Sequence, residues 1–343
     1  MSKTASLLIV LSISVLVLVL GKNLIIPFVF ALFIWLLMRK FREILNKLPL
    51  FEKWIPRWVK TIMSSLIFIS IFLFLGSLVK NNLLDLIESV ENNPGNFDKI
   101  IQQLSSIFPF DFKTIQNDKE ISQTIAKSLT FVFNSLGQLV QQAMVILLYV
   151  IFILLEESSF SLKLEALVKG ADNLADTKKI FYKIEASVTN YVGLKTLIAS
   201  IASGISYLIL YFTGIEAPFF WALVIFVMNF IPTIGALVGT LFPTAFAFLQ
   251  FGELGPGLII LTLVGSTQLL VGNFLEPRLM GNSLNVSPLV TVLALAFWGT
   301  IWGITGMFLS VPITVIMVIV FSHFPKTRAI AILLSEKGNI EAK

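Results

Sequence analysis

The last third of this chain is almost free of charge. Residues 196–322 are long apolar runs that keep only four charged side chains, Glu216, Glu253, Glu276 and Arg278. An ion inside hydrocarbon costs at least about 2.5 kcal/mol, so charges kept among such runs indicate a bilayer interface or a functional site. Soluble domains carry roughly a quarter charged residues, whereas this chain of 343 residues has 13%. The sequence therefore predicts a membrane protein.

Apolar stretches of about the length of a membrane-spanning helix recur along the chain. They predict spans at 5–20, 23–38, 61–80, 137–155, 196–212 and 256–272, with two longer apolar stretches at 218–250 and 288–321. The loop after the second span is rich in Lys and Arg, which by the positive-inside rule places it and both termini in the cytoplasm. This topology accounts for the net charge of +5, so nucleic acid is not an expected partner.

The predicted organisation has five parts. Apolar residues at helical spacing, such as Phe97 and Ile101, predict an amphipathic helix in the loop that follows the third span. The parts are N-terminal transmembrane helices with a basic cytoplasmic loop (1–80), an extracytoplasmic helical insertion (81–136), a transmembrane helix with a cytoplasmic amphipathic helix (137–195), a transport core (196–321) and a cytoplasmic tail (322–343).

The two longest apolar stretches are each interrupted in the middle. Pro232 and Gly235 interrupt 218–250, and several glycines interrupt 288–321. A stretch of 33 residues is too long for one span at about 1.5 Å per residue, so each folds back as two full spans or as a re-entrant hairpin.

A span followed by a broken hairpin occurs at 196–250 and again, entering from the opposite side, at 256–321. This hydropathy pattern is typical of an inverted repeat, which in secondary transporters places the solute near mid-bilayer. We therefore favour hairpins, and expect an all-α polytopic membrane protein of about eight membrane segments that contacts a lipid bilayer.

Polar side chains within membrane segments are the candidate residues for substrate binding or ion coupling. A solute that sheds water needs replacement partners, which Asn229 at the first break and Gln268 inside an apolar run can supply. Asn273, Glu276 and Arg278 follow at the predicted cytoplasmic end of that run. The structural alternatives are a locally satisfied Asn, an interhelical hydrogen bond from Gln268, and a Glu276–Arg278 ion pair at a helix end.

Prolines and glycines mark where these helices could hinge or break. Glycines four residues apart let helix backbones approach closely, so helix packing is the default explanation of these glycines. The same close packing is compatible with a homo-oligomer. The hinge or break candidates are Pro232, Gly235, Pro277, Gly281, Gly303, Gly306 and Pro312.

The residue inventory argues against an enzyme. The chain has no Cys, and its single histidine, His323, lies in the tail, so Ser-His, Cys-His and multi-histidine metal sites are unavailable. No phosphate-binding or dinucleotide-binding glycine motif is present. We therefore expect no cofactor and no metal, and any energy source would be an ion gradient or the gradient of the solute.

Several motifs in the last third together resemble the autoinducer-2 exporter (AI-2E) family of bacterial and archaeal membrane proteins, also called predicted permeases. The resemblance is specific over about residues 200–320, and it implies about eight membrane segments and movement of a small solute. The motifs are Asn229–Gly235, Asn273–Gly281, Ser287–Val290, Phe297–Gly299, Trp302–Met307 and Val311–Pro312.

The resemblance implies two different activities, and a third reading stands beside them. The first is export or permeation of a small polar solute such as autoinducer-2 by alternating access, with Asn229, Gln268 and Asn273 as its polar neighbours. The second is exchange of sodium or lithium for protons, with Glu276 as the titrating carboxylate. The third is a membrane scaffold that transports nothing and recruits a partner through the 81–136 insertion.

Overall fold

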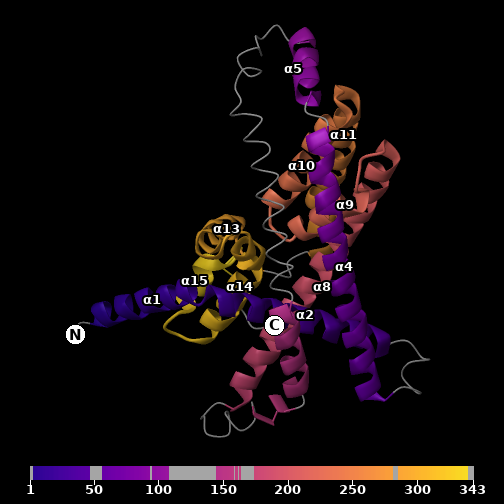
Figure 1. The fold of residues 1–343 in the computed structure, drawn as a ribbon. Coiled ribbons are helices and arrows are strands. Elements are labelled where there is room, and N and C mark those ends of the chain that lie inside the picture. The colour runs from indigo at the N-terminus through magenta and orange to yellow at the C-terminus, as the bar shows by residue number, and fades with distance from the viewer. Residues whose placement is uncertain are drawn as a thin grey trace. The chain divides into compact units, whose positions relative to one another are not determined.

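The structure is a computed structural model that describes residues 3–46, 56–92, 95–107, 144–157, 159–160, 162–163, 174–280 and 285–338. Every regular element within these ranges is a helix (Figure 1). The predicted all-α membrane fold is therefore confirmed, while the number of spans stays a prediction. Among the described residues, five stretches are long and apolar enough to cross a bilayer: Lys22–Glu43, Ile180–Thr213, Ile234–Phe251, Leu254–Met280 and Ile304–His323.

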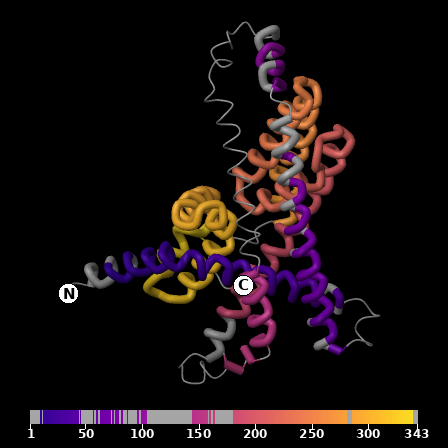
Figure 2. The backbone as a smooth tube through the Cα atoms, viewed as in Figure 1, coloured from indigo at the N-terminus to yellow at the C-terminus, as the bar shows by residue number. Residues whose placement is uncertain are grey.

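The chain divides into two compact units, and each is described here by itself. Helices α4 (Arg57–Asn92) and α8 (Leu174–Thr213), whose backbones Figure 2 traces, contribute residues to both units. Unit 1 comprises Met1–Ser70, Gln142–Gly193 and Asn282–Lys343, and unit 2 comprises Ile71–Gln141 and Leu194–Gly281.

Unit 1 joins the two ends of the chain. A small core of Ala31, Met38, Ile146 and Val150 packs α2 against the helical stretch at 144–157. The indole Nε1 of Trp302 donates a hydrogen bond of 2.9 Å to the carbonyl of Leu18. The helices of this unit are α1 (Lys3–Leu20), α2 (Lys22–Asn46), α13 (Pro288–Trp302), α14 (Ile304–His323) and α15 (Arg328–Leu334).

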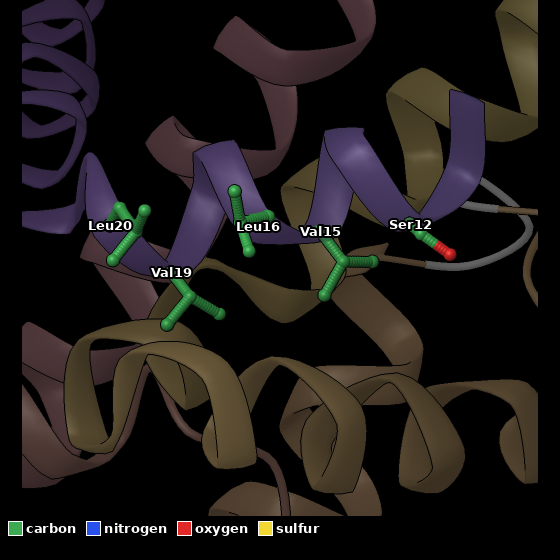
Figure 3. Close-up of a pocket in the computed structure, with 5 residues that line it drawn as sticks. All are labelled: Ser12, Val15, Leu16, Val19 and Leu20. Carbon is green, nitrogen blue, oxygen red and sulfur yellow. The ribbon is translucent and has the colours of Figure 1, made fainter. Parts of the chain in front are cut away.

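A hollow of unit 1 lies along α1. It has a volume of about 490 Å³, and Figure 3 shows that its lining side chains all come from that one helix. Four of the five are aliphatic, and Ser12 supplies the single hydroxyl. A surface of this composition can contact lipid chains, and it offers a polar solute almost no hydrogen-bonding partner.

Unit 2 consists of helices that pack in chain order. Helix α9 packs on α10, α10 packs on α11, and α5 contacts α10 (Figure 1). Helix α11 continues through a π-helical turn into α12 without a break. The elements are α5 (Asn96–Ile107), the second half of α8, α9 (Pro218–Met228), α10 (Ile234–Phe251), α11 (Leu254–Leu270), the π-helix η1 (Val271–Leu275) and α12 (Glu276–Met280).

Both long apolar stretches are interrupted in the structure. Residues 229–233, which include Pro232, separate α9 from α10, and Thr233 has φ 59°. Gly303 separates α13 from α14 with φ 64° and ψ −142°, a conformation that is essentially restricted to glycine. Helix α9 has 11 residues and is only about 16 Å long, which is about half of a bilayer core.

The two hairpins turn in a similar way at their second helix. A Cβ at Gly235 would lie 1.9 Å from the carbonyl oxygen of Met228, and a Cβ at Gly306 would lie 1.9 Å from that of Trp298. Each glycine therefore lets the second helix of its hairpin touch the backbone at the end of the first.

The remaining candidates for hinges do not break a helix. Pro312 lies inside α14 and Pro277 lies inside α12, and both helices continue past them. Gly281 lies outside the described residues.

Candidate functional site

A partly buried ion pair joins α8 to α12 within unit 2. The ammonium Nζ of Lys195 donates a hydrogen bond to Oε1 of Glu276, and the two side chains are 4% and 30% exposed. Sequence reasoning proposed Glu276 and missed Lys195, because that residue directly precedes the apolar run and was assigned to the cytoplasmic stretch. In the structure Lys195 lies on the buried face of α8, together with Ala199 and Ala202.

The π-helical turn directs Glu276 toward α8. Eight residues of α-helix turn by about 800°, so Glu276 would lie about 80° away from the face of Gln268 if the helix were regular. The amide of Glu276 instead bonds to the carbonyl of Val271, five residues earlier, which takes up one extra residue. Gln268 and Glu276 consequently share one face of the α11–α12 helix.

Arg278 and Asn273 take no part in this ion pair. Residues two apart on a helix do not face each other, so Arg278 cannot follow Glu276 toward α8. Both Arg278 and Asn273 are exposed, and Arg278 forms no ion pair with any residue that the structure describes. The structure therefore pairs Glu276 with Lys195 in place of the Glu276–Arg278 pair that the sequence left open.

Gln268 is buried where α10 crosses α11. The residue is 4% exposed, and its Nε2 has no hydrogen-bond partner among the described residues. That nitrogen lies 3.6 Å from the position that a Cβ of Gly239 would occupy, and Ile225 of α9 approaches the same glycine. Because Nε2 has no partner in the described ranges, an interhelical hydrogen bond does not explain the burial of Gln268. A buried amide donor without a partner costs about 1–3 kcal/mol.

Asn229 has a local partner. It is buried at the end of α9, and its Nδ2 donates a hydrogen bond of 2.8 Å to the carbonyl of Ile225. The backbone amide of Asn229 bonds to the same carbonyl. The side chain thus closes the last turn of α9, which is the structural reading that the sequence offered for it.

Two amides of α5 hold the turn between α10 and α11. Asn96 Nδ2 donates to the carbonyls of Leu249 and Gln250, at 2.8 and 3.0 Å. Gln103 Nε2 donates to the carbonyl of Gly252, and its Oε1 accepts from the amide of Leu254. These contacts satisfy groups that helix ends leave open, and they tie the described part of the insertion to unit 2.

Helices α8 and α11 lie side by side along an apolar groove. The groove has a volume of about 620 Å³, and Phe212 at the end of α8 and Pro256 at the start of α11 belong to its lining. The chain order therefore makes the two helices antiparallel. The other lining residues are Ile205, Leu208, Ile209, Thr213, Ile259 and Leu263.

These features define a class of protein. Apolar helices long enough to cross a bilayer, a broken hairpin and an enclosed polar face are the features of a multi-pass membrane transporter. The chain belongs to the AI-2E family of transporters, whose family profile matches residues 8–326.

Relatives with transport names match most of the chain. The AI-2 transport protein TqsA of Escherichia coli (strain K12) is 30% identical over 326 residues, which cover 92% of this chain and 90% of TqsA. A putative transport protein of Haemophilus influenzae is 25% identical over 92% of this chain and 91% of its own length. A putative transport protein of Borreliella burgdorferi is 30% identical over 68% and 65%.

Proposed function

We propose that this protein is a secondary transporter that exports a small polar solute of the autoinducer-2 type across the inner membrane by alternating access. The observation that carries the proposal is the burial of Gln268 between the broken α9–α10 hairpin and α11, with its amide nitrogen unpaired. A solute in the membrane interior needs such a partner in place of water. The similarity to TqsA supports the choice of solute.

The hairpins supply the moving parts in this proposal. Helix α9 is too short to cross a bilayer, so its end and the start of α10 would lie near the middle of the membrane. The second, oppositely oriented copy of the repeat would be α11 followed by α13 and α14. A change of access from one side to the other would require α9 and α10 to separate from α11 around Gln268.

A second candidate function is the exchange of sodium or lithium for protons, and the Lys195–Glu276 pair favours it. A sodium or lithium ion that binds the Glu276 carboxylate would take the place of the Lys195 ammonium beside it. The third reading, a scaffold that recruits through the insertion, is weakened because α5 binds the chain's own α10–α11 turn.

Counterflow in proteoliposomes separates the two transport functions. Purified full-length protein is reconstituted, and the exchange of labelled autoinducer-2 is followed beside the internal pH. The proposal expects labelled solute to exchange with no pH change. A proton flux that sodium triggers and that Glu276→Gln abolishes would replace the proposal with the antiporter.

A further inference from the structure

A polar hollow of unit 2 lies where α5 meets the turn between α10 and α11. Its volume is about 380 Å³, and it is lined by both a cation and an anion, Lys99 of α5 and Glu253 at the start of α11. Both residues are exposed, and they form no ion pair with each other or with another residue that the structure describes. The hollow therefore presents two separate, opposite charges. The other lining residues are Gln102, Gln103, Phe251 and Gly252.

The fold uses neither charge. Lys99 Nζ donates a hydrogen bond of 3.2 Å to the neutral side-chain oxygen of Asn96. Glu253 is the N-cap of α11 but makes no capping bond with its side chain. The amide of Leu254 is already bonded to Gln103 Oε1, and the proline two residues further on has no N–H to donate. The carboxylate of Glu253 consequently keeps its capacity to accept hydrogen bonds from a ligand.

The apolar groove between α8 and α11 begins beside this hollow. Glu253 of the hollow and Pro256 of the groove are three residues apart, so the first turn of α11 carries both. On the other side, Gln250 Nε2 donates a hydrogen bond of 3.2 Å to the carbonyl of Gly214. The residue after Gln250 lines the hollow, and the residue before Gly214 lines the groove. The hollow is thus the polar mouth of the groove.

The groove is suited to a hydrocarbon chain. Seven of its eight lining residues are apolar, and the hydroxyl of the eighth, Thr213, already donates to the carbonyl of Leu210 at 2.8 Å. From Ile205 to Thr213 the groove follows α8 for about 12 Å. One leaflet contributes about half of a hydrocarbon core of about 30 Å. The groove therefore fits within the depth of a single leaflet.

Aromatic side chains mark the membrane boundary at the same end of α8. Tyr211 and Phe212 are both exposed, and their ring centroids are 5.6 Å apart. Tyr207 packs against Tyr211 at 6.1 Å one turn deeper. Tyrosines are enriched where a membrane meets water. The hollow then lies at the level of the lipid headgroups, and the groove lies at the depth of the acyl chains.

We propose that the hollow and the groove together bind one phosphatidylethanolamine molecule. An acyl chain occupies the groove, the primary ammonium of the headgroup donates to Glu253, and the phosphate accepts from Lys99. The two charges of the mouth sum to zero, as do those of this headgroup. Phosphatidylglycerol would leave Glu253 without a partner, and the ammonium of phosphatidylcholine has no N–H to donate. This site does not depend on which solute the protein transports.

The hollow along α1 illustrates the difference from general lipid contact. It is similarly apolar, but none of its lining residues is charged. A lipid chain can lie there with any headgroup. Selection of one headgroup is expected only where opposite charges stand at the mouth, as Lys99 and Glu253 do.

Native mass spectrometry of the full-length protein in detergent tests the selection of the headgroup. Phosphatidylethanolamine, phosphatidylcholine and phosphatidylglycerol, each with two oleoyl chains, are titrated separately, and the first dissociation constant is compared. Phosphatidylethanolamine should bind about 3–5-fold more tightly than either of the others, as exposed ion pairs allow. Equal dissociation constants for the three lipids would overturn the proposal.

Charge variants test the two residues of the mouth. Glu253→Gln leaves Lys99 as the only charge, so the preference should move from phosphatidylethanolamine to phosphatidylglycerol. Lys99→Met should weaken the binding of all three lipids, because each carries a phosphate. Glu336→Gln makes the same change of charge at an exposed position of the predicted cytoplasmic tail and should alter nothing. A preference for phosphatidylethanolamine that persists in Glu253→Gln would refute the site.

A photoreactive phosphatidylethanolamine locates the chain. With a diazirine on one acyl chain, its crosslinks should fall within residues 205–213 and 256–263, and their yield should drop about 3–5-fold in Glu253→Gln. Free glycerophosphoethanolamine, which has the headgroup without chains, should not compete at concentrations at which the lipid saturates the protein. Competition by it would show that the headgroup binds without the groove, and would overturn the proposal of a bound lipid.

The same experiment recognises another occupant of the groove. Crosslinks that avoid both segments would overturn the assignment to a lipid. If Leu208→Trp, which narrows the groove, then also dissociated an oligomer of the full-length protein in size-exclusion chromatography, the groove would belong to a second copy of the chain.

Discussion

Lys195 of α8 and Glu276 of α12 form an ion pair although 81 positions separate them in the chain. The pair is unequal, because the lysine side chain is 4% exposed and the glutamate side chain is 30% exposed. Water can reach the carboxylate and can hardly reach the ammonium. The two partners should therefore tolerate the loss of each other differently.

Removing the carboxylate should be the more harmful change. Glu276→Gln keeps an oxygen acceptor but leaves the enclosed ammonium without a counter-charge, which should lower the free energy of unfolding by about 3–5 kcal/mol. Lys195→Met leaves a partly hydrated carboxylate and should cost clearly less. Thermal unfolding of the full-length protein in detergent measures both, and equal losses would contradict the prediction.

The double variant provides the control for that comparison. Lys195→Met together with Glu276→Gln contains no unpaired charge, so it should be more stable than Glu276→Gln alone. Arg278→Met should change the unfolding midpoint little, because the exposed Arg278 has no ion-pair partner in the described ranges.

Two glycines should be indispensable for closing the hairpins. Gly235→Ala and Gly306→Ala would each place a Cβ 1.9 Å from a backbone carbonyl oxygen that cannot move aside easily. We expect each change to cost about 3 kcal/mol or more and to reduce the yield of monodisperse protein in size-exclusion chromatography. A variant at either position with an unaltered unfolding midpoint would show that the hairpin closes differently.

Gly204 is the matched control for this prediction. It lies inside α8, and a Cβ there would meet nothing within 4 Å. Gly204→Ala should stabilise the protein by about 0.5–1 kcal/mol, because alanine loses less backbone freedom in a helix.

The helical class could be predicted from the sequence because it depends on local chemistry. The apolar runs and the interruptions near Pro232 and Gly303 are visible as residue types at fixed positions, and the structure places breaks there. The partner of Glu276 could not be found in this way. It depends on one extra residue in a π-helical turn, which rotates the carboxylate by about 100° and has no residue signature in this chain.

The roles of the candidate polar residues could be distinguished only from their surroundings in the structure. Asn229 and Gln268 look equivalent in the sequence, as single amides inside apolar runs. Asn229 reaches a carbonyl four residues earlier, whereas Gln268 faces Gly239 on another helix. The difference arises from the neighbouring helix, which a sequence pattern does not specify.

The amides of α5 should control the mobility of the α10–α11 turn. Gln103→Ala removes both hydrogen bonds to that turn, and we expect the amide of Leu254 to exchange with solvent hydrogen about 5–10-fold faster. Gln102→Ala changes an exposed neighbour on the same helix and should leave the exchange rate unaltered. Hydrogen exchange of residues 249–255 distinguishes the two, and equal rates in both variants would remove α5 as the restraint.

The depth of the hairpin turns can be measured directly, because the chain has no cysteine of its own. Single cysteines at Thr233 and Ile304 would mark the two turns, and cysteines at Glu216 and Lys326 would mark the predicted outer and inner aqueous boundaries. A re-entrant α9 of about 16 Å ends near the middle of the bilayer. A membrane-impermeant maleimide added from inside should therefore label Lys326→Cys and spare Thr233→Cys.

The second hairpin gives the mirror-image expectation. Added from outside, the same reagent should label Glu216→Cys and spare Ile304→Cys, because α13 is only about 22 Å long and would turn back before the far boundary. Labelling of Thr233→Cys from inside and of Ile304→Cys from outside, each as fast as its boundary control, would show that both hairpins are pairs of full spans. The α9–α10 turn would then lie in water, and Gln268 would have to be reached by a solute through a route other than the separation of that hairpin from α11.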